Sequence, residues 1–326
     1  MAVVETAAMR KAIVGDGILN VNKPAGWTSH DVVAKLRGLL KGQKTGHAGT
    51  LDPAATGVLP VLIGRGTRIA EYLLAWDKEY RAVLRLGQAT DTQDATGTVL
   101  ATKPLDGLTD EKIRTAIAGF RGRITQTPPM YSAVKVGGVP LYKAARAGKT
   151  VERDSREIEI HALDVLAING ADVVLNVRCS KGTYVRTLCA DIGETLGVGG
   201  HLLSLERTRV GPLAVAQALT IEEIGAQVLS GRIGDALLTL DAALEMLPAV
   251  VVDERTAGRV RHGVAVPAGA SRWVAEPRNE PTAVRVKDEA GCLLAIGALA
   301  PGSAGGNVVP GIAIDKVLVD VETVSR

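Results

Sequence analysis

The segment GHAGTLDPAATGVLP, residues 46–60, is the most informative part of this 326-residue sequence. Glycines, a histidine and one aspartate stand together in it, between two segments with regular hydrophobic patterns. Pro53 restricts the preceding Asp52 to an extended backbone, and glycines allow a backbone to approach a ligand closely. An isolated Asp-Pro pair would indicate a simple turn, with His47 on the surface. A polar run of this length instead favours a functional loop that presents the Asp52 carboxylate.

The flanking segments predict short strands and amphipathic helices. Residues 17–22 alternate apolar and polar side chains, as a strand does. Apolar residues at helical spacing over 32–40 predict a helix, with Ser29 as its N-cap. A polar, glycine-rich loop is expected over 42–57, followed by a buried strand over 58–63.

The rest of the first 210 residues continues this mixture. Residues 79–86 alternate, which places Tyr80 on the same face as three apolar side chains. A helix capped by Thr109 or Asp110 follows. The remaining predicted elements are strands over 157–160 and 173–179 and a helix over 185–196. Strands and helices without a regular β-α-β rhythm predict an α+β fold with a mixed or antiparallel sheet.

Composition divides the chain into three parts. Hydrophobic residues make up 46% of it and charged residues 22%, which is enough apolar material for a large core and excludes general disorder. After about residue 245 the composition shifts to Val, Ala, Gly and Pro, with balanced or acidic charge. We therefore expect an N-terminal tail over 1–16, a large motif-bearing domain over 17–245, and a small β-rich domain over 246–326.

The distribution of charge is more informative than its sum. The formal net charge is +3, but residues 1–210 hold 28 basic and 21 acidic side chains, and residues 211–326 hold 10 and 14. A polyanion is therefore expected to dock on the first two thirds of the chain. An ordinary solvated surface is the alternative interpretation for each cation singly. The candidate phosphate contacts are Lys41, Lys44, Arg65, Arg68, Lys143, Arg146 and Lys149.

Several classes of protein are excluded by what the sequence lacks. Cys179, Cys189 and Cys292 are widely spaced and form no CxxC, so they support neither a disulfide framework nor a zinc site. Residues 42–44 lack the adjacent Gly-Lys of a phosphate-binding loop. No cofactor and no metal are therefore expected. The N-terminus does not resemble a signal peptide, and prolines interrupt the longest uncharged stretch, 290–314, so we expect a cytoplasmic protein without membrane helices.

Two further clusters are candidates for chemistry. Residues 179–188 (CSKGTYVRTL) place two cations and a tyrosine where a strand passes into a helix. The helix dipole disfavours a cation at a helix N-terminus, which favours a buried ion pair or a ligand contact for Arg186 over a solvated position. Residues 77–81 place Tyr80 on a strand face. With only one Phe, three Trp and five Tyr in the chain, Tyr80 is suited to stack on a flat ligand, and capping the core is an equally good interpretation.

These motifs, in this order, resemble the TruB family of bacterial tRNA pseudouridine synthases. The matching segments are 23–29, 46–60, 78–81, 90–94 and 179–186. The resemblance extends from residue 17 to about residue 210. It implies a pseudouridine synthase fold with a mixed, largely antiparallel sheet. It also implies isomerisation of uridine to pseudouridine at the T-loop position of tRNA conventionally numbered 55.

The resemblance further implies roles for single residues. Asp52 takes the position of the catalytic aspartate, Arg186 that of its arginine partner, and Tyr80 that of the active-site tyrosine stacked on the target base. His47 corresponds to a histidine that helps to hold the flipped-out loop, and Lys23 to a motif that supports the catalytic loop. The expected catalytic residues are Asp52, Arg186 and Tyr80. The expected substrate-binding residues are His47, Tyr80, Tyr184, Leu205 and Lys23.

The residue types suit this chemistry. Uridine and pseudouridine are isomers, so the reaction needs no redox cofactor or group donor. It needs an ionised carboxylate beside the sugar, as nucleophile or as base, and the sequence leaves open which. A paired Arg186 lowers the pKa of Asp52, whereas burial raises it. The target base must leave its stack at a cost of roughly a few kcal/mol, which stacking on Tyr80 and insertion of His47 would offset.

Two other functions remain open from the residues. A non-catalytic RNA-binding or tRNA-folding module would keep the binding motifs without turnover. A guide-RNA-dependent relative acting on ribosomal RNA would share the catalytic motifs, but the chain length and the lack of long basic tails disfavour it. We therefore expect tRNA as the partner, no guide RNA, no obligate protein partner and a monomer. The unit over 246–326 is expected to be a PUA-like RNA-binding domain.

Overall fold

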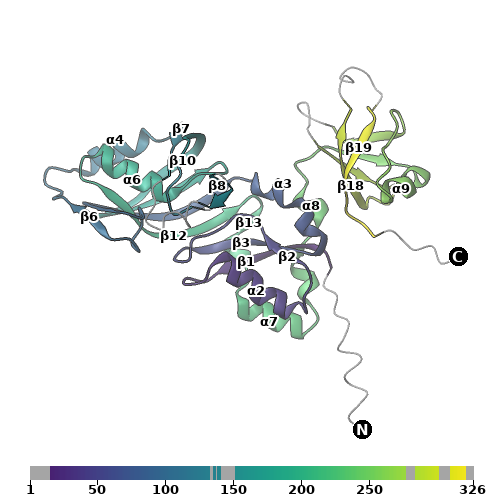
Figure 1. Ribbon diagram of the computed structural model, residues 1–326, viewed down its shortest axis with the longest axis horizontal. Coiled ribbons are helices and arrows are strands. Elements are labelled where there is room, and N and C mark those ends of the chain that lie inside the picture. Colours follow the sequence, from purple (N-terminus) through teal and green to yellow (C-terminus); the bar gives the residue numbers. More distant parts are fainter. Residues whose placement is uncertain are drawn as a thin grey trace, which may run out of the picture.

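The computed structural model describes residues 15–132, 135–136, 138–140, 151–276, 283–300 and 309–320. The described residues form a long sheet, to which the two ends of the 46–60 segment belong, and a smaller sheet built from residues after 248 (Figure 1). Lys143, Arg146 and Lys149, three of the expected phosphate contacts, lie outside the described residues. Among the helices described, none has the length and apolar character needed to cross a membrane.

The long sheet is mixed and largely antiparallel, and the expected α+β fold is confirmed. Its strands, within the described residues, are β1 (Gly17–Lys23), β2 (Thr45–His47), β3 (Thr56–Ile63), β4 (Lys78–Leu86), β7 (Gly122–Gln126), β10 (Arg156–Asn169), β11 (Asp172–Cys179), β12 (Gly200–Val210), β13 (Leu213–Ala214) and β14 (Leu237–Leu238). The main path runs β14-β1-β3-β12-β4-β11-β10-β7, with β2 paired to β3 and β13 to β12. Among the strands described, β3 and β12 pair in parallel and the other pairs of this sheet are antiparallel.

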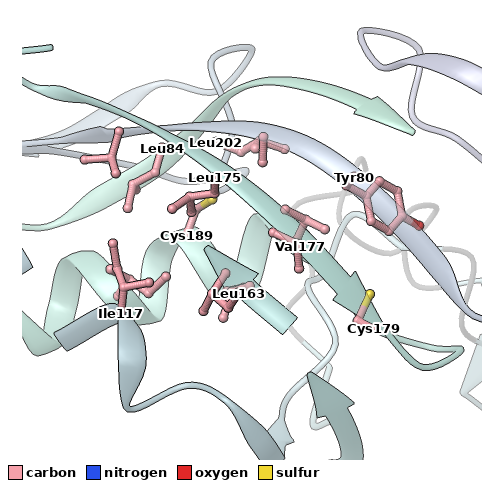
Figure 2. Packing of buried hydrophobic residues seen from close by; sticks show 14 of the residues in the cluster. Tyr80, Leu84, Ile117, Leu163, Leu175, Val177, Cys179, Cys189 and Leu202 are labelled. Atoms are coloured by element: carbon pink, nitrogen blue, oxygen red, sulfur yellow. The ribbon is translucent and has the colours of Figure 1, made fainter. Parts of the chain in front are cut away.

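The alternation predicted for residues 79–86 produces one face of the core. On β4, Tyr80 and Leu84 are buried whereas Arg81 between them is exposed. Val177 of β11 and Cys189 belong to the same buried cluster (Figure 2). Tyr80 lies at one end of this cluster, with its hydroxyl oxygen directed away from the aliphatic side chains (Figure 2). Because aromatic residues are scarce, the cluster is otherwise made almost entirely of aliphatic side chains.

Helices cover the two halves of the long sheet separately. The helices in the described residues are α2 (Ser29–Leu39), α3 (Ala70–Leu74), α4 (Asp110–Ala118), α6 (Val185–Thr195), α7 (Ile221–Leu229), α8 (Leu240–Ala243) and α9 (Glu254–Arg261), with 3-10 helices over Gly64–Ile69, Val215–Gln217 and Ile233–Ala236. Of these, α9 packs on the smaller sheet. α4 and α6 pack on β10 and β11 in one buried cluster. α2 and α7 pack on β1 in another, at the other end of the sheet (Figure 1). The described residues also form two short hairpins, β5 (Gln88–Thr90) with β6 (Val99–Thr102) and β8 (Lys135–Val136) with β9 (Val139–Pro140).

Two local predictions were wrong. The N-cap of α2 is Thr28, not Ser29: the Thr28 backbone is extended, and its hydroxyl forms a capping box with Asp31. The expected loop over 42–57 also contains a strand, since β2 pairs with β3 from Thr45 opposite Ile63 to His47 opposite Val61. A three-residue strand is too short to produce a recognisable alternation, so only the pairing reveals it.

The smaller sheet has its own core and is joined to the long one. Its strands are β15 (Ala249–Val252), β16 (Ser271–Ala275), β17 (Val284–Lys287), β18 (Leu293–Leu299) and β19 (Ile312–Val317), in the order β16-β15-β17-β18-β19. A buried cluster with α9 fills one side of this sheet. A second cluster brings Ile296 and Leu318 against Leu73 of α3 and Leu240 of α8. This β-rich unit confirms the expected small sheet; its boundary at 245/246 and its PUA-like, RNA-binding character stay predictions.

Polar contacts reinforce the junction of the two sheets. Arg65 forms ion pairs with Asp16 and with Asp320, the latter at 3.2 Å. Arg68 donates from Nη1 to the carbonyl of Val317 at 2.6 Å. Both arginines were candidate phosphate contacts. In the structure they connect the 3-10 helix after β3 to the end of the small sheet. Some of the cationic side chains of the first 210 residues therefore form contacts within the protein.

Candidate active site

The loop that carries Asp52 is held by a buried lysine at the end of β1. Lys23 is fully buried, and its Nζ donates to the carbonyls of Pro24 at 2.9 Å, Trp27 at 2.7 Å and Pro53 at 3.1 Å. Burial lowers the pKa of Lys23 to about 8, and the nearby Asp52 charge opposes that change. Its three acceptors are protein carbonyls, so the substrate-binding role predicted for Lys23 would act through the loop.

A second contact holds the residue directly before Asp52. The buried Ser29 hydroxyl accepts from the Leu51 N–H at 2.9 Å and donates to the Leu51 carbonyl at 3.2 Å. This is why Ser29 is not the N-cap of α2: its hydroxyl faces the loop. The Gly26 N–H also donates to the Pro53 carbonyl at 2.9 Å. The backbones of both residues that flank Asp52, Leu51 and Pro53, are therefore held by the 23–29 segment.

Arg207 of β12 fixes the preceding part of the loop. Its side chain donates from Nε to the Val58 carbonyl at 2.7 Å and from Nη2 to the Gly49 carbonyl at 3.0 Å. Its backbone lies against Gly57, where φ is +97° and an added Cβ would be 2.3 Å from the Arg207 carbonyl oxygen. Gly57 is therefore required by close approach as well as by backbone conformation.

Arg186 and Asp52 form the ion pair that the resemblance implied. The Arg186 Nε lies 2.9 Å from Asp52 Oδ2, and its Nη2 lies 3.4 Å from Oδ1. Arg186 is 5% exposed. It also donates to the carbonyls of Thr92 at 3.2 Å and Tyr131 at 2.8 Å. One guanidinium thus contacts three segments that are distant from it in sequence. Arg186 therefore has the buried, paired position that its place at the start of a helix favoured.

A second carboxylate lies beside Arg186. Asp94 Oδ2 is 3.8 Å from Arg186 Nε, and the Asp94 side chain is 19% exposed. Its Oδ1 accepts from the Thr92 hydroxyl at 2.7 Å and the Thr96 hydroxyl at 2.6 Å. Gln93, in the left-handed region with φ of 64°, accepts a hydrogen bond from Thr187 of α6 at 3.0 Å. The 90–97 loop is therefore attached to the same helix that carries Arg186.

Burial decides the direction of the Asp52 titration. The pKa of Asp52 is raised above its ordinary value, mainly by burial; the Arg186 charge opposes the rise and the Asp94 charge adds to it. Both opposing effects expected from the sequence are present, and burial is the larger. The carboxyl nevertheless remains accessible, since 41% of the side-chain surface is exposed. An accessible carboxyl with a raised pKa and a fixed cation is suited to acid-base or nucleophilic chemistry.

Three other predicted residues lie on strands of the long sheet. Tyr80 of β4 and Leu205 of β12 pack in the same cluster as Leu51. The Asp52 charge acts on the pKa of Tyr80, which burial raises. His47 is half-buried at the end of β2; its Nδ1 has no partner among the described residues, and burial lowers its pKa, which favours the neutral ring. The structure thus places Tyr80 and Leu205 in one cluster with Leu51, the residue before Asp52, and His47 where the Arg207 charge acts on it. Their roles toward a substrate stay predictions.

Tyr184 is oriented by a residue that the sequence did not indicate. The buried Gln126 accepts from the Tyr184 N–H at 3.0 Å and donates to the Tyr184 carbonyl at 3.2 Å. The Arg156 guanidinium lies 4.9 Å from the centre of the Tyr184 ring. Tyr184 is the N-cap residue of α6, two positions before Arg186. Gln126 therefore fixes the start of the helix that presents Arg186.

Sequence reasoning missed Arg207, Asp94 and Gln126. Asp94 lay inside a matching segment, so its position in the TDTQD sequence was an available signal. Arg207 and Gln126 had no local signal, because each side chain acts on a segment far away in sequence. No group of three or more His, Cys, Asp or Glu side chains in the described residues could hold a metal ion. The expectation that no metal and no cofactor take part stays a prediction.

Comparisons with known proteins agree with this geometry. The N-terminal domain of TruB family pseudouridylate synthases matches residues 37–185. The C-terminal domain of tRNA pseudouridylate synthase B matches residues 186–245. Both matches lie within the part of the chain that forms the long sheet and its helices. The 246–326 unit is covered by neither of the two.

Relatives and solved structures are similar over most of the chain. The tRNA pseudouridine synthase B of Symbiobacterium thermophilum is 51% identical over 77% of this chain and 83% of the relative. That of Stutzerimonas stutzeri is 42% identical over 90% of this chain and 94% of the relative. A Cbf5-Nop10-Gar1 complex has a similar chain with a TM-score of 0.74 and 30% identity, over 96% of this chain and 88% of that one. The chain belongs to the TruB family of tRNA pseudouridine synthases.

Proposed function

We propose that this protein converts the uridine at the T-loop position of tRNA conventionally numbered 55 to pseudouridine, with Asp52 as the catalytic carboxylate. The observation that carries the proposal is the pairing of accessible Asp52 with buried Arg186. Tyr80 and Leu205 pack in the same cluster as Leu51, the residue before Asp52. The names of the relatives support tRNA as the substrate, and the position within tRNA follows from the resemblance of the motifs.

The proposed reaction needs few groups from the protein. The bond between C1′ of the ribose and N1 of uracil breaks, and a bond between C1′ and C5 forms. C5 loses a proton and N1 gains one, so the products balance without another reactant. Asp52 assists either as nucleophile or as base, in its ionised form. Arg186 stabilises that form and holds the carboxylate in one orientation with two donors.

Binding of tRNA is proposed to combine cationic contacts with capture of the flipped base. Lys41 and Lys44 lie on the described surface beside the loop before β2 and remain candidates for phosphate contacts. Tyr80 is proposed to stack on the target base and His47 to hold the space it leaves. The 246–326 unit is proposed as a PUA-like RNA-binding domain. The protein is proposed to work in the cytoplasm as a monomer, without guide RNA or an obligate protein partner.

One experiment tests two things together: which position of tRNA the protein modifies, and whether it does so without a guide RNA or another protein. Purified protein is incubated with an unmodified tRNA transcript, and pseudouridine is mapped along the product by chemical modification and reverse transcription. We expect modification at position 55, and none in a control transcript with cytidine there. Because similar chains occur in a Cbf5-Nop10-Gar1 complex and in an H/ACA RNP bound to a substrate RNA, a guide-dependent enzyme is the alternative. Absence of product on naked tRNA would favour that alternative and overturn the proposal.

A further inference from the structure

Helix α6, which carries Arg186, begins without the residues that usually begin a helix. Helices α2, α4, α7 and α9 each follow a Thr or Asp whose side chain accepts from a backbone N–H of the first turn, and each has an acidic residue in that turn. Among the described helices of eight or more residues, α6 alone has neither. Its N-cap residue is Tyr184, and Arg186 places a cation in the first turn. A group from outside the helix is therefore needed at this end.

The side chain that could close this end from within α6 bonds elsewhere. In a capping box, the side chain of the third helical residue accepts from the backbone N–H of the N-cap residue. In α6 that third residue is Thr187, and its hydroxyl donates to Gln93 Oε1 at 3.0 Å instead. This bond lies next to the one from Arg186 to the Thr92 carbonyl. The Tyr184 N–H is thus left for a partner from another segment.

Gln126 is that partner. It is the last residue of β7 and is 1% exposed. Its Oε1 accepts from the Tyr184 N–H at 3.0 Å, as the third residue of a capping box would, and its Nε2 donates to the Tyr184 carbonyl at 3.2 Å. One side-chain amide thus bonds to both backbone polar groups of the N-cap residue. Two bonds from one planar group fix the orientation of the first turn as well as its distance from β7.

The segment that follows Gln126 contacts the same turn. The Tyr131 carbonyl accepts from Arg186 Nη2 at 2.8 Å. Between Gln126 and Tyr131, the Pro128 carbonyl accepts from Arg153 at 2.9 Å, which attaches the middle of the segment to the residues before β10. The segment therefore contacts the start of α6 at both of its ends. Its first contact holds the helix backbone, and its last holds the Arg186 side chain.

We propose that Gln126 is a positioning residue: by holding the first turn of α6, it sets the direction from which the Arg186 guanidinium meets the Asp52 carboxylate. The inference rests on the proposed function for the catalytic role of that ion pair. Arg186 lies two residues after Tyr184, so a rotation of the first turn would disturb its contacts with Asp52 at 2.9 and 3.4 Å. The oxygen and the nitrogen of the Gln126 amide both bond to Tyr184. Gln126 therefore acts through Arg186 and not on the substrate.

A purely structural role predicts a different result. If Gln126 only satisfied buried polar groups, its loss would lower Tm and leave the rate and its pH dependence unchanged. Asn20 of β1 offers a matched control, because it is also a buried amide, 8% exposed, and it donates to the Ala214 carbonyl at 2.9 Å. That bond joins β1 to β13 and involves neither α6 nor the Asp52 loop. Asn20→Leu therefore removes a similar contact outside the active site.

The test compares Gln126→Met and Asn20→Leu in the full-length protein. Methionine is close to glutamine in size and removes both hydrogen bonds. We expect the single-turnover rate constant of Gln126→Met at saturating tRNA to fall by about 10- to 100-fold, as small displacements in an active site do, with tRNA affinity unchanged. The acid limb of its pH–rate profile should move to higher pH, because a looser contact with Arg186 lowers the pKa of Asp52 less. Asn20→Leu should lower Tm only.

Two further measurements show whether Gln126 acts through Arg186. In an Arg186→Gln background, Gln126→Met should lower the rate constant by much less than in the wild type, because two changes that act through one contact are not additive. The NMR signal of the Arg186 Nε–H, assigned by its loss in Arg186→Lys, reports the ion pair without substrate. Gln126→Met should move this signal, and Asn20→Leu should leave it in place.

The inference fails if a folded Gln126→Met protein keeps the wild-type rate and pH profile, if its effect is fully additive with Arg186→Gln, or if Asn20→Leu reproduces the changes. If Gln126→Met does not fold, Gln126→Glu decides between the two roles, since it keeps the acceptor for the Tyr184 N–H and, when ionised, loses the donor; a wild-type rate and an unmoved Arg186 signal in that variant would overturn the inference. A wild-type protein that fails to modify position 55 would refute the proposed function, and the NMR comparison would still judge the effect of Gln126 on the ion pair.

Discussion

Two carboxylates flank the Arg186 guanidinium, and the loops that carry them are held in different ways. The Asp52 loop is fixed through its backbone, by side chains that come from distant segments: Lys23, Ser29 and Arg207. The Asp94 loop also has contacts with a distant segment, through Arg186 and Thr187 of α6, but in addition the Asp94 carboxylate accepts from the hydroxyls of neighbouring threonines. The Asp94 carboxylate thus helps to hold its own loop, whereas Lys23, Ser29 and Arg207 hold the Asp52 loop through its backbone.

This difference distinguishes the Asp52 carboxylate, which is free to react, from the Asp94 carboxylate, which is already hydrogen-bonded within its loop. The hydrogen bonds of Asp94 to Thr92 and Thr96 occupy the oxygen that does not face Arg186. In the described residues, the Asp52 carboxylate receives its hydrogen bond and its ion pair from Arg186. Because the backbone of the Asp52 loop is held elsewhere, its carboxylate need not hold the loop. Asp52 is therefore the one available to a substrate.

Asp52→Asn should cause the largest loss of activity, because it changes the carboxylate that is free to react. The amide keeps the size of the side chain and removes the charge, so we expect pseudouridine formation to fall by on the order of 10⁴-fold or more, as loss of a catalytic carboxylate does. The measurement is release of tritium from C5 of labelled uridine in tRNA, with tRNA binding as the control. Substantial turnover by a folded Asp52→Asn protein would remove Asp52 from the mechanism.

Arg186→Lys should have the next largest effect. Lysine keeps a positive charge but cannot reproduce the two-point contact with Asp52 or the bonds to the Thr92 and Tyr131 carbonyls. We expect the single-turnover rate constant to fall by about 10²- to 10³-fold, with tRNA affinity retained. A loss of affinity that accounts for the lower rate would instead make Arg186 a binding residue.

Asp94→Asn should give a smaller effect and a diagnostic change with pH. The wild-type rate should fall as pH decreases through the raised pKa of Asp52, because the reaction needs the ionised carboxylate. Removing the Asp94 charge lowers the pKa of Asp52, so this acid limb should move to lower pH. Arg186→Gln should move it to higher pH. The rate constant of Asp94→Asn should fall by about tenfold, and shifts of equal sign in the two variants would contradict the electrostatic account.

Ser29→Ala compared with Thr28→Ala should give the smallest effects. Ser29→Ala leaves the buried Leu51 peptide group without its partner, which costs about 1–3 kcal/mol of stability and should also lower the rate by loosening the loop. Thr28→Ala removes the cap of α2, for about 1 kcal/mol, and should leave the rate unchanged. Thermal unfolding and single-turnover rates measure both. Equal rates in the two variants would show that the contact to Leu51 is not needed for catalysis.

Much of the fold was predictable because short-range patterns in the sequence define its strands and helices. The alternation over 79–86 and the helical spacing over 185–196 correspond closely to β4 and α6. The failures involved elements that local patterns do not define: β2 is three residues long, and the choice between Thr28 and Ser29 as N-cap depended on which hydroxyl the loop required. Burial and pairing, which depend on the whole chain, decided both.

The sequence by itself determined the mixed α+β class and the motif-bearing loop, because motif composition and hydrophobic period are local properties, and the resemblance of its motifs implied the pairing of Asp52 with Arg186. Only the tertiary structure decided the rest of the site. It showed that burial raises the pKa of Asp52 by more than the Arg186 charge lowers it. It also showed that Arg65 and Arg68 form contacts at the junction of the two sheets. It also brought Arg207 to the Asp52 loop and, in the sheet, opposite Tyr80. Each of these depends on which groups meet and on how much water is excluded where they meet, and residues more than a hundred positions apart meet only when the sheet has formed.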